Sequence, residues 1–201
     1  MRYVGIPAVV STSAAPFGLI GGWALAAYMW PEYDPIRQTI SELAAGDAPT
    51  AVMMNAMFVL AGICHLTSAV FLYAVAIPGR AILAVGGLAS IALAWFPLPT
   101  VDSTTTAHRV VAGISFIALA IWPAFGWRRR PASQLLSAFP MILATVVMLA
   151  LCGWFFLVWD SEGAITGFVE RTAVGAEVLF PGLVAWMLVA RERARRGRFH
   201  F

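Results

Sequence analysis

The chain alternates between six long apolar runs and short polar stretches. A helix needs about 20 mostly apolar residues to cross a hydrocarbon layer of about 30 Å. Each run approaches or exceeds that length, so each predicts one transmembrane helix. The runs lie at about 5–30, 51–77, 81–97, 106–127, 136–158 and 168–190. We predict an all-α integral membrane protein, a six-transmembrane-helix bundle that forms one domain over 1–201, with a basic tail at 191–201.

The composition agrees with a membrane as the solvent. Of the 201 residues, 61% are hydrophobic and 11% are charged, whereas about a quarter of the residues in a soluble domain are charged. The sequence contains no lysine, which excludes chemistry that needs a lysine amine, such as a Schiff base. We expect membrane lipids as partners, with no nucleic acid, no metal and no cofactor, and the oligomeric state stays open.

The arginines are distributed unequally over the turns between the runs. Ten of the thirteen lie before the first run, in the second and fourth turns, or in the tail: Arg2, Arg80, Arg128, Arg129, Arg130, Arg191, Arg193, Arg195, Arg196 and Arg198. Arginine-rich loops stay on the cytoplasmic side of a membrane. The bias predicts a multi-pass protein of the cell membrane with both termini in the cytoplasm and outer loops at about 31–50, 98–107 and 159–167.

Two outer loops carry the same order of residue types: Trp-Phe-x-Leu, then Asp-Ser, then an ionisable residue before Arg-x-x-x-Gly. The first copy is Trp95 to Leu98, Asp102-Ser103, His108-Arg109 and Gly113, and the second is Trp154 to Leu157, Asp160-Ser161, Glu170-Arg171 and Gly175. The pattern predicts a pseudo-repeat of helix hairpins, formed by runs three and four and by runs five and six, that are related by an axis along the membrane normal. We expect each glycine to allow close approach of another helix.

The first outer loop, 31–50, predicts a short helix of its own. Thr39 stands three residues before Glu42, which is the spacing of a capping box. The helix should begin near Thr39 and end by Gly46. Asp47 is then expected to cap the second span, with Pro49 in its first turn.

Three arginines on the outer side are candidates for substrate binding: Arg37, Arg109 and Arg171. The last two fall near the start of a span, where the helix dipole is already positive, so a cation is unfavourable unless an anion joins it. This favours an anionic ligand, such as a phosphate or carboxylate head group. We expect at least two of these arginines to pair with Glu42, Glu170 or Glu177 when the site is empty.

Deeper polar residues extend the candidate site. His65 and Glu177 fall inside apolar runs, where an ionisable residue is a functional candidate by default. His65 is a further candidate for substrate binding. The candidate catalytic residues, which could move protons, are Glu42, Asp102, His108, Glu170 and Glu177. The alternative is an internal cluster of ion pairs that only fixes the helix arrangement. Cys64 and Cys152 are expected to be buried apolar residues.

Several of these motifs together resemble one family. The segment from Tyr33 to Leu43, then His108-Arg109 with Gly113, then Glu170-Arg171, is similar to the domain of unknown function 998 family of bacterial and archaeal multi-pass membrane proteins. The resemblance covers nearly the whole chain. It implies a compact bundle of spans with polar residues on one side, and it supplies no activity.

Three function classes stay open. The protein could be an enzyme or carrier that binds or processes an anionic lipid or isoprenoid at a polar site near the outer leaflet. It could be an acid-initiated isoprenoid (terpene) cyclase, in which a neutral Glu177 or Asp102 protonates an alkene and aromatic residues shield the cation. It could also be a non-catalytic membrane subunit or small transporter whose charge cluster is structural.

Overall fold

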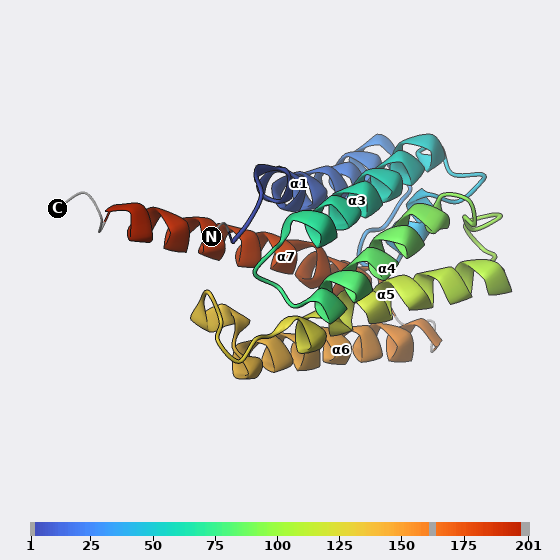
Figure 1. The fold of residues 1–201 in the computed structure, drawn as a ribbon. Helices are drawn as coiled ribbons and strands as arrows, with labels where there is room; N and C mark the ends of the chain where they lie inside the picture. The colour runs from blue at the N-terminus through green and yellow to red at the C-terminus, as the bar shows by residue number, and fades with distance from the viewer. Residues whose placement is uncertain (1–2, 161–163, 198–201) are drawn as a thin grey trace.

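The computed structural model describes residues 3–160 and 164–197, and all regular structure in these ranges is helical (Figure 1). The elements are α1 (Ile6–Met29), α2 (Ile40–Leu43), α3 (Ala51–Phe71), α4 (Ile77–Leu93), α5 (Thr106–Gly126), the 3-10 helix η1 (Gln134–Leu136), α6 (Ala138–Asp160) and α7 (Thr166–Gly197). The prediction of an all-α membrane bundle is confirmed.

Five of the described helices, namely α1, α3, α5, α6 and α7, are long and apolar enough to cross a membrane. Helix α4 is apolar but has 17 residues, which gives about 26 Å at 1.5 Å per residue. This is a little less than the hydrocarbon layer. The sixth span therefore stays a prediction.

The helix bounds differ most from the predicted runs at the turn between α3 and α4. The second run was expected to reach 77, yet α3 ends at Phe71 and α4 begins at Ile77. Arg80 bonds two carbonyl oxygens in the last turn of α3, with Nε on Ala69 and Nη2 on Val70 at 2.6 Å. Pro78 fits the first turn of α4, where its missing N–H costs nothing. Apolar composition alone does not show such a turn.

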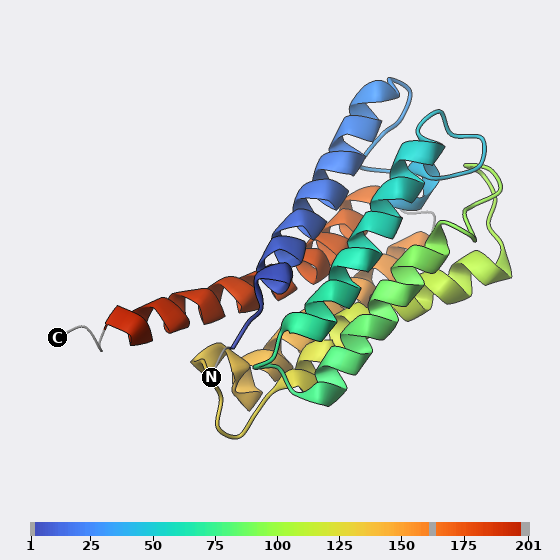
Figure 2. The ribbon, with the colours of Figure 1, turned by 45° about the horizontal axis from the view of Figure 1, so that its top comes forward.

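The long helices close into a ring in the order of the chain. Each packs against the next, from α1 against α3 through to α6 against α7, and α7 returns to pack against α1. Helices α5 and α7 also touch across the ring, and α2 contacts α1 and α7. Successive long helices run in opposite directions, so the two described ends of the chain lie at the same end of the bundle (Figure 2).

Two glycine pairs bring neighbouring helices close together. A Cβ on Gly62 of α3 would lie 2.5 Å from the carbonyl oxygen of Gly87 in α4, and a Cβ on Gly79 would lie 2.4 Å from the Cα of Gly126 in α5. The glycines of the Arg-x-x-x-Gly motifs behave differently, because a Cβ at Gly113 or Gly175 would meet no atom within 4 Å. The expected close approach at those two positions is wrong.

The two ends of the bundle have different contents. The end that holds the termini is filled by an apolar core that includes Leu72, Leu83, Trp122, Met141 and Leu188. The other end carries the loop 31–50, the loop 94–105 and the start of α7 (Figure 2). Helices α4 and α5 pack as one pair and α6 and α7 as another, while the axis relating them stays a prediction. Asp160-Ser161 of the second motif lies outside the described side chains.

Candidate functional site

The first loop forms the short helix α2 over the end of the bundle. The capping box is confirmed: Thr39 Oγ1 accepts from the Glu42 N–H at 3.2 Å, and Glu42 Oε1 accepts from the Thr39 N–H at 2.9 Å. Ile40 and Leu43 are 1% and 0% exposed. Burial of these two side chains fixes α2 on the bundle, and this sets the positions of Thr39 and Glu42.

Asp47 has a different role from the one expected. The N-cap position of α3 is Thr50, whose side chain makes no capping hydrogen bond, and Pro49 precedes the helix instead of lying in its first turn. Asp47 Oδ1 accepts from the Val101 N–H at 3.0 Å, and the Gly46 N–H donates to the Leu98 carbonyl at 2.9 Å. These bonds join the first loop to the α4–α5 loop.

The start of α7 binds the first loop through its backbone. The N–H groups at the start of a helix lack partners within the helix. Here the Gly167 N–H donates to the Arg37 carbonyl at 3.1 Å, and the Phe168 N–H donates to the Ile36 carbonyl at 3.0 Å. A Cβ on Gly167 would lie 2.0 Å from the Gln38 carbonyl oxygen. Only glycine permits this approach, and the loop occupies the place where an anion could otherwise bind.

Arg171 completes this attachment with its side chain. Its Nη1 donates to the carbonyl oxygens of Pro35 and Gln38, both at 2.9 Å, and its Nη2 donates to the Tyr33 hydroxyl. The Tyr33 hydroxyl donates to the Gln38 and Thr39 carbonyls at 2.8 and 2.7 Å. Burial raises the pKa of Tyr33 well above its usual range, although the Arg171 cation acts in the opposite direction. Arg171 thus serves to hold the loop.

The expected pairing of arginines with acids is wrong. In residues 3–160 and 164–197 the one ion pair is between Arg37 and Asp34, with Nε and Oδ2 3.6 Å apart, and both side chains are largely exposed. Arg171 is satisfied by carbonyl and hydroxyl oxygens, and Glu170 accepts the Ile40 N–H. Backbone groups of the first loop take the place that opposite charges were predicted to fill.

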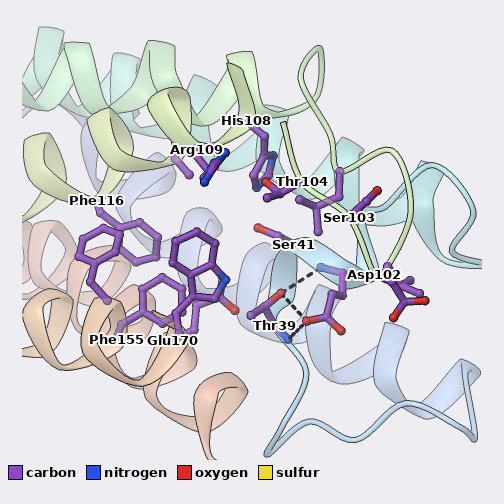
Figure 3. A pocket seen from close by; sticks show the side chains of 16 residues that line it. Thr39, Ser41, Asp102, Ser103, Thr104, His108, Arg109, Phe116, Phe155 and Glu170 are labelled. Carbon is purple, nitrogen blue, oxygen red and sulfur yellow. Dashed lines mark hydrogen bonds between the residues drawn. The ribbon is translucent and has the colours of Figure 1, made fainter. Parts of the chain in front are cut away.

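A cavity of about 260 Å³, here called the outer cavity, opens beneath the first loop (Figure 3). Its polar lining is Thr39, Ser41, Glu42, Asp102, Ser103, Thr104, His108, Arg109 and Glu170. Its apolar lining is Leu98, Val101, Ala112, Phe116, Phe155, Phe156 and Trp159. Phe116 and Phe155 stack with their ring centres 5.2 Å apart. The cavity therefore has a polar portion beside an aromatic wall.

His108 and Arg109 face this cavity from the start of α5, opposite Thr39 and Glu170 (Figure 3). His108 Nδ1 lies 2.7 Å from the Phe96 carbonyl oxygen. A carbonyl only accepts, so Nδ1 carries the hydrogen and Nε2 stays available. The exposed Arg109 side chain makes no hydrogen bond or ion pair to any part of the chain that the structure describes.

A second, smaller cavity of about 50 Å³, here called the inner chamber, lies between α1, α2, α3, α4, α5 and α7. Its polar lining is Ser41, His65, Ser90, Ser115, Glu170 and Glu177. Ser41, Ala112, Phe116 and Glu170 line both cavities. His65 and Glu177 are each 2% exposed. The deep polar residues thus gather next to the outer cavity.

Cys152 is buried, as expected, yet it also has a polar contact. Its thiol donates to Glu177 Oε1 at 3.2 Å. Sequence reasoning treated this cysteine as an apolar residue because nothing near it in the chain suggested a polar partner. The signal missed was Glu177, whose carboxyl group needs a donor when buried.

The candidate residues divide into three groups. Glu42, Asp102, His108, Arg109 and Glu170 line the outer cavity, while His65 and Glu177 join Glu170 in the inner chamber. Arg37 and Arg171 line neither cavity. Sequence reasoning missed the aromatic wall, although Phe155 and Phe156 lie inside the repeated motif, and it missed the hydroxyl groups of Ser90 and Ser115 within apolar runs.

Comparison with known proteins adds a family and no activity. No curated protein and no solved structure matches the chain. The model of the family described as protein of unknown function (DUF998) matches residues 13–187. That range contains every residue lining the two cavities. The chain therefore belongs to the DUF998 family of proteins of unknown function, as the motifs around Thr39, His108 and Glu170 predicted.

Proposed function

We propose that the outer cavity binds the phosphate-bearing head group of an amphiphile, a lipid or an isoprenoid, whose apolar chain lies along the aromatic wall. The observation that carries this proposal is Arg109. It is an exposed guanidinium without a partner in the described structure, at the edge of a cavity whose other side is aromatic. Guanidinium groups bind phosphate oxygens with two parallel hydrogen bonds.

The size of the cavity limits what it can enclose. Sites that enclose a whole small molecule occupy roughly 300–1,000 Å³, and the outer cavity has about 260 Å³. This volume suits a head group with its first few carbon atoms, while the rest of the chain stays in the bilayer. The cavity is lined by residues of the first loop and of the α4–α5 loop, which lie at the end of the bundle opposite the termini (Figure 2). The arginine distribution predicts that this end faces the outer leaflet.

Two of the three carboxyl groups in the polar lining refine the choice of head group. Glu42 Oε1 accepts from the N–H and hydroxyl of Thr39 at 2.9 and 3.0 Å, and Asp102 is exposed on the α4–α5 loop. Neither pairs with Arg109. They favour a head group that has hydrogen-bond donors, such as hydroxyl or ammonium groups, next to its phosphate.

The other function classes receive less support. A chamber of about 50 Å³ around Glu177 leaves no room for a folded isoprenoid chain, and Asp102 is exposed rather than enclosed by aromatic rings. A purely structural role fits Arg171, whose donors are used by the first loop. It does not account for Arg109.

The test compares octyl phosphate with octanol, which share a chain and differ in charge. We expect Arg109→Gln to weaken binding of octyl phosphate by about 10- to 100-fold, the value of one or two charge-assisted bonds, and to leave octanol binding unchanged. Arg37→Gln is the matched control, because Arg37 lines neither cavity. Equal losses in the two variants, or full retention in Arg109→Gln, would refute the proposal. Geranyl phosphate in place of octyl phosphate distinguishes an isoprenoid chain from a straight one.

A further inference from the structure

The inner chamber is polar in a part of the bundle that is otherwise apolar. A buried water takes up about 30 Å³ of liquid volume and needs several polar partners. The chamber has about 50 Å³, and His65, Ser90, Ser115 and Glu177 offer such partners. It is therefore suited to one or two water molecules.

His65 supplies an observation that is independent of the volume. Its side chain is 2% exposed and makes no hydrogen bond to the residues that the structure describes. Buried imidazole nitrogens almost always have a partner, from protein or from water. The ring lines the chamber, held beside α4 because Gly87 has no side chain: a Cβ there would lie 3.1 Å from the His65 Cβ.

Glu177 also lines the inner chamber, and its buried carboxyl group needs hydrogen-bond partners. Cys152 bonds one carboxyl oxygen, and no arginine contacts the group in residues 3–160 and 164–197. An ionised carboxylate with only a thiol donor is costly in such a place, so the group is held neutral or bonded through water. Two serine hydroxyl groups also line the chamber. The Oγ atoms of Ser90 and Ser115 are 3.1 Å apart, and the Ser90 hydroxyl donates to the Gly86 carbonyl at 2.9 Å.

The chamber adjoins the outer cavity, because four residues line both spaces, and it faces apolar core on its other side. Among the residues that the structure describes, Glu170 is the one ionisable residue that lines both spaces, and its Oε2 is fixed by the Ile40 N–H. Toward the termini the chamber ends at Leu119, which belongs to the core of Leu72, Leu83 and Trp122. Glu170 is therefore placed to pass a proton between the two spaces.

We propose that the inner chamber is a water-filled protonation site, in which Glu177 and His65 exchange protons with the outer cavity through Glu170. A proton from the outer cavity joins the Glu170 carboxylate. Glu170 then gives its proton through water to the Glu177 carboxylate or to the His65 ring, and the reverse sequence releases it. The charge that enters the chamber is one proton, and no other bond changes.

The charged and titratable groups around Glu170 set the direction of this exchange. They are Glu42 from α2, His65 from α3, Asp102 from the α4–α5 loop, His108 and Arg109 from α5, Tyr33 from the first loop, and Arg171 and Glu177 from α7 itself. A phosphate in the outer cavity adds negative charge beside Glu170, which favours the protonated carboxyl group. Binding of an anionic head group should therefore draw a proton in, a consequence that rests on the proposed function.

The first experiment needs no ligand. Infrared spectra of the protein in D₂O should show a carboxylic acid band that is absent from Glu177→Gln, present in Glu32→Gln, and shifted by deuterium soon after mixing. Ala112→Leu places a larger side chain where the two spaces adjoin and should slow that shift by about tenfold or more. Ser41→Leu serves if the first variant does not fold. A band that exchanges only on unfolding, or no band lost in Glu177→Gln, would overturn the proposal.

The second experiment measures protons taken up with octyl phosphate, by calorimetry in two buffers of different ionisation enthalpy. We expect uptake of up to about one proton by the wild type, a smaller number in Glu170→Gln, and an unchanged number in Glu32→Gln. Unchanged uptake in Glu170→Gln would refute the role of Glu170 in this exchange. Absence of octyl phosphate binding would instead refute the proposed function. The infrared measurement would then still test whether the inner chamber is a protonation site.

Discussion

The starts of α5 and α7 carry the same short motif and use it for different purposes. In α7, Arg171 donates to the first loop, and the N–H groups of Gly167 and Phe168 do the same. In α5, the Thr105 hydroxyl accepts from the His108 N–H at 3.1 Å, and Arg109 points to the outer cavity without a partner in the described residues. One arginine holds the structure, and the other is available.

The comparison shows that an arginine near a helix start does not by itself mark a ligand site. The positive end of a helix calls for negative charge or for carbonyl oxygens, and the first loop supplies carbonyls to α7. The α4–α5 loop brings none to Arg109. What distinguishes the two sites is which loop folds back over them.

The largest expected effect is steric and falls on α7. Gly167→Val should destabilise the fold by about 3 kcal/mol or more, because its side chain would overlap the Gln38 carbonyl and displace the first loop. The midpoint of thermal unfolding in mild detergent measures this. Gly113→Ala in α5 is the matched control, since its Cβ meets nothing within 4 Å, and it should leave the midpoint unchanged or slightly raised. An equal decrease of the midpoint in both variants would mean that the first loop does not depend on the close contact at Gly167.

The next effect separates the two arginines. Arg171→Gln should cost about 2–3 kcal/mol, because the carbonyls of Pro35 and Gln38 and the Tyr33 hydroxyl lose a charged donor. Arg109→Gln should change stability by less than about 0.5 kcal/mol, as an exposed side chain without partners. Urea or thermal unfolding of both variants in the same detergent tests the difference. A larger loss in Arg109→Gln would reverse the assignment of roles.

A smaller effect is expected at the capping box that positions α2. Thr39→Ala removes the hydroxyl that accepts from the Glu42 N–H and should cost about 1 kcal/mol. Thr39→Ser keeps the hydroxyl and should retain most of the stability. If Thr39→Ala and Thr39→Ser have the same midpoint of thermal unfolding, the capping box does not stabilise the first loop.

The smallest effect appears only in alkaline solution. Burial raises the pKa of Tyr33, so the folded state keeps the phenol proton at a pH where the unfolded chain loses it. This contribution is complete below the ordinary tyrosine value of about 10 and declines as the pH rises above it. The unfolding midpoint should therefore fall above about pH 10, and less steeply in Tyr33→Phe. The absence of lysine keeps this range free of ammonium titration. If the unfolding midpoint falls with pH equally steeply in the wild type and in Tyr33→Phe, Tyr33 is not the group responsible.

Much of the fold could be read from the chain because its causes are local. Run lengths located the long helices, and the Thr39 to Glu42 spacing located the start of α2 within a residue. The close helix approach predicted at Gly113 and Gly175 is wrong, because a sequence motif does not show which face of a helix meets a neighbour. The glycines that do make close contacts, such as Gly62 and Gly87, belong to no repeated pattern.

The polar residues singled out in the sequence have partners that the sequence does not show. Several of those in the outer loops and in two apolar runs line two adjoining cavities, while the site itself stays a prediction. Their partners could not be predicted, since they are backbone groups far away in the chain: Glu170 bonds the Ile40 N–H across 130 residues, and Arg171 bonds the Gln38 carbonyl across 133. Sequence patterns record side chains, whereas these contacts depend on where a loop places its carbonyls.

Closure of the ring by α1 and α7 sets an order of assembly. Each long helix can dock on the helix made just before it, so hairpins can form as the chain emerges into the membrane. The first loop, made early, finds Gly167, Glu170 and Arg171 only when the last helix arrives. Until then Glu170 is missing from both cavities. A chain that stops before α7 would thus keep most of its helices and have no finished site.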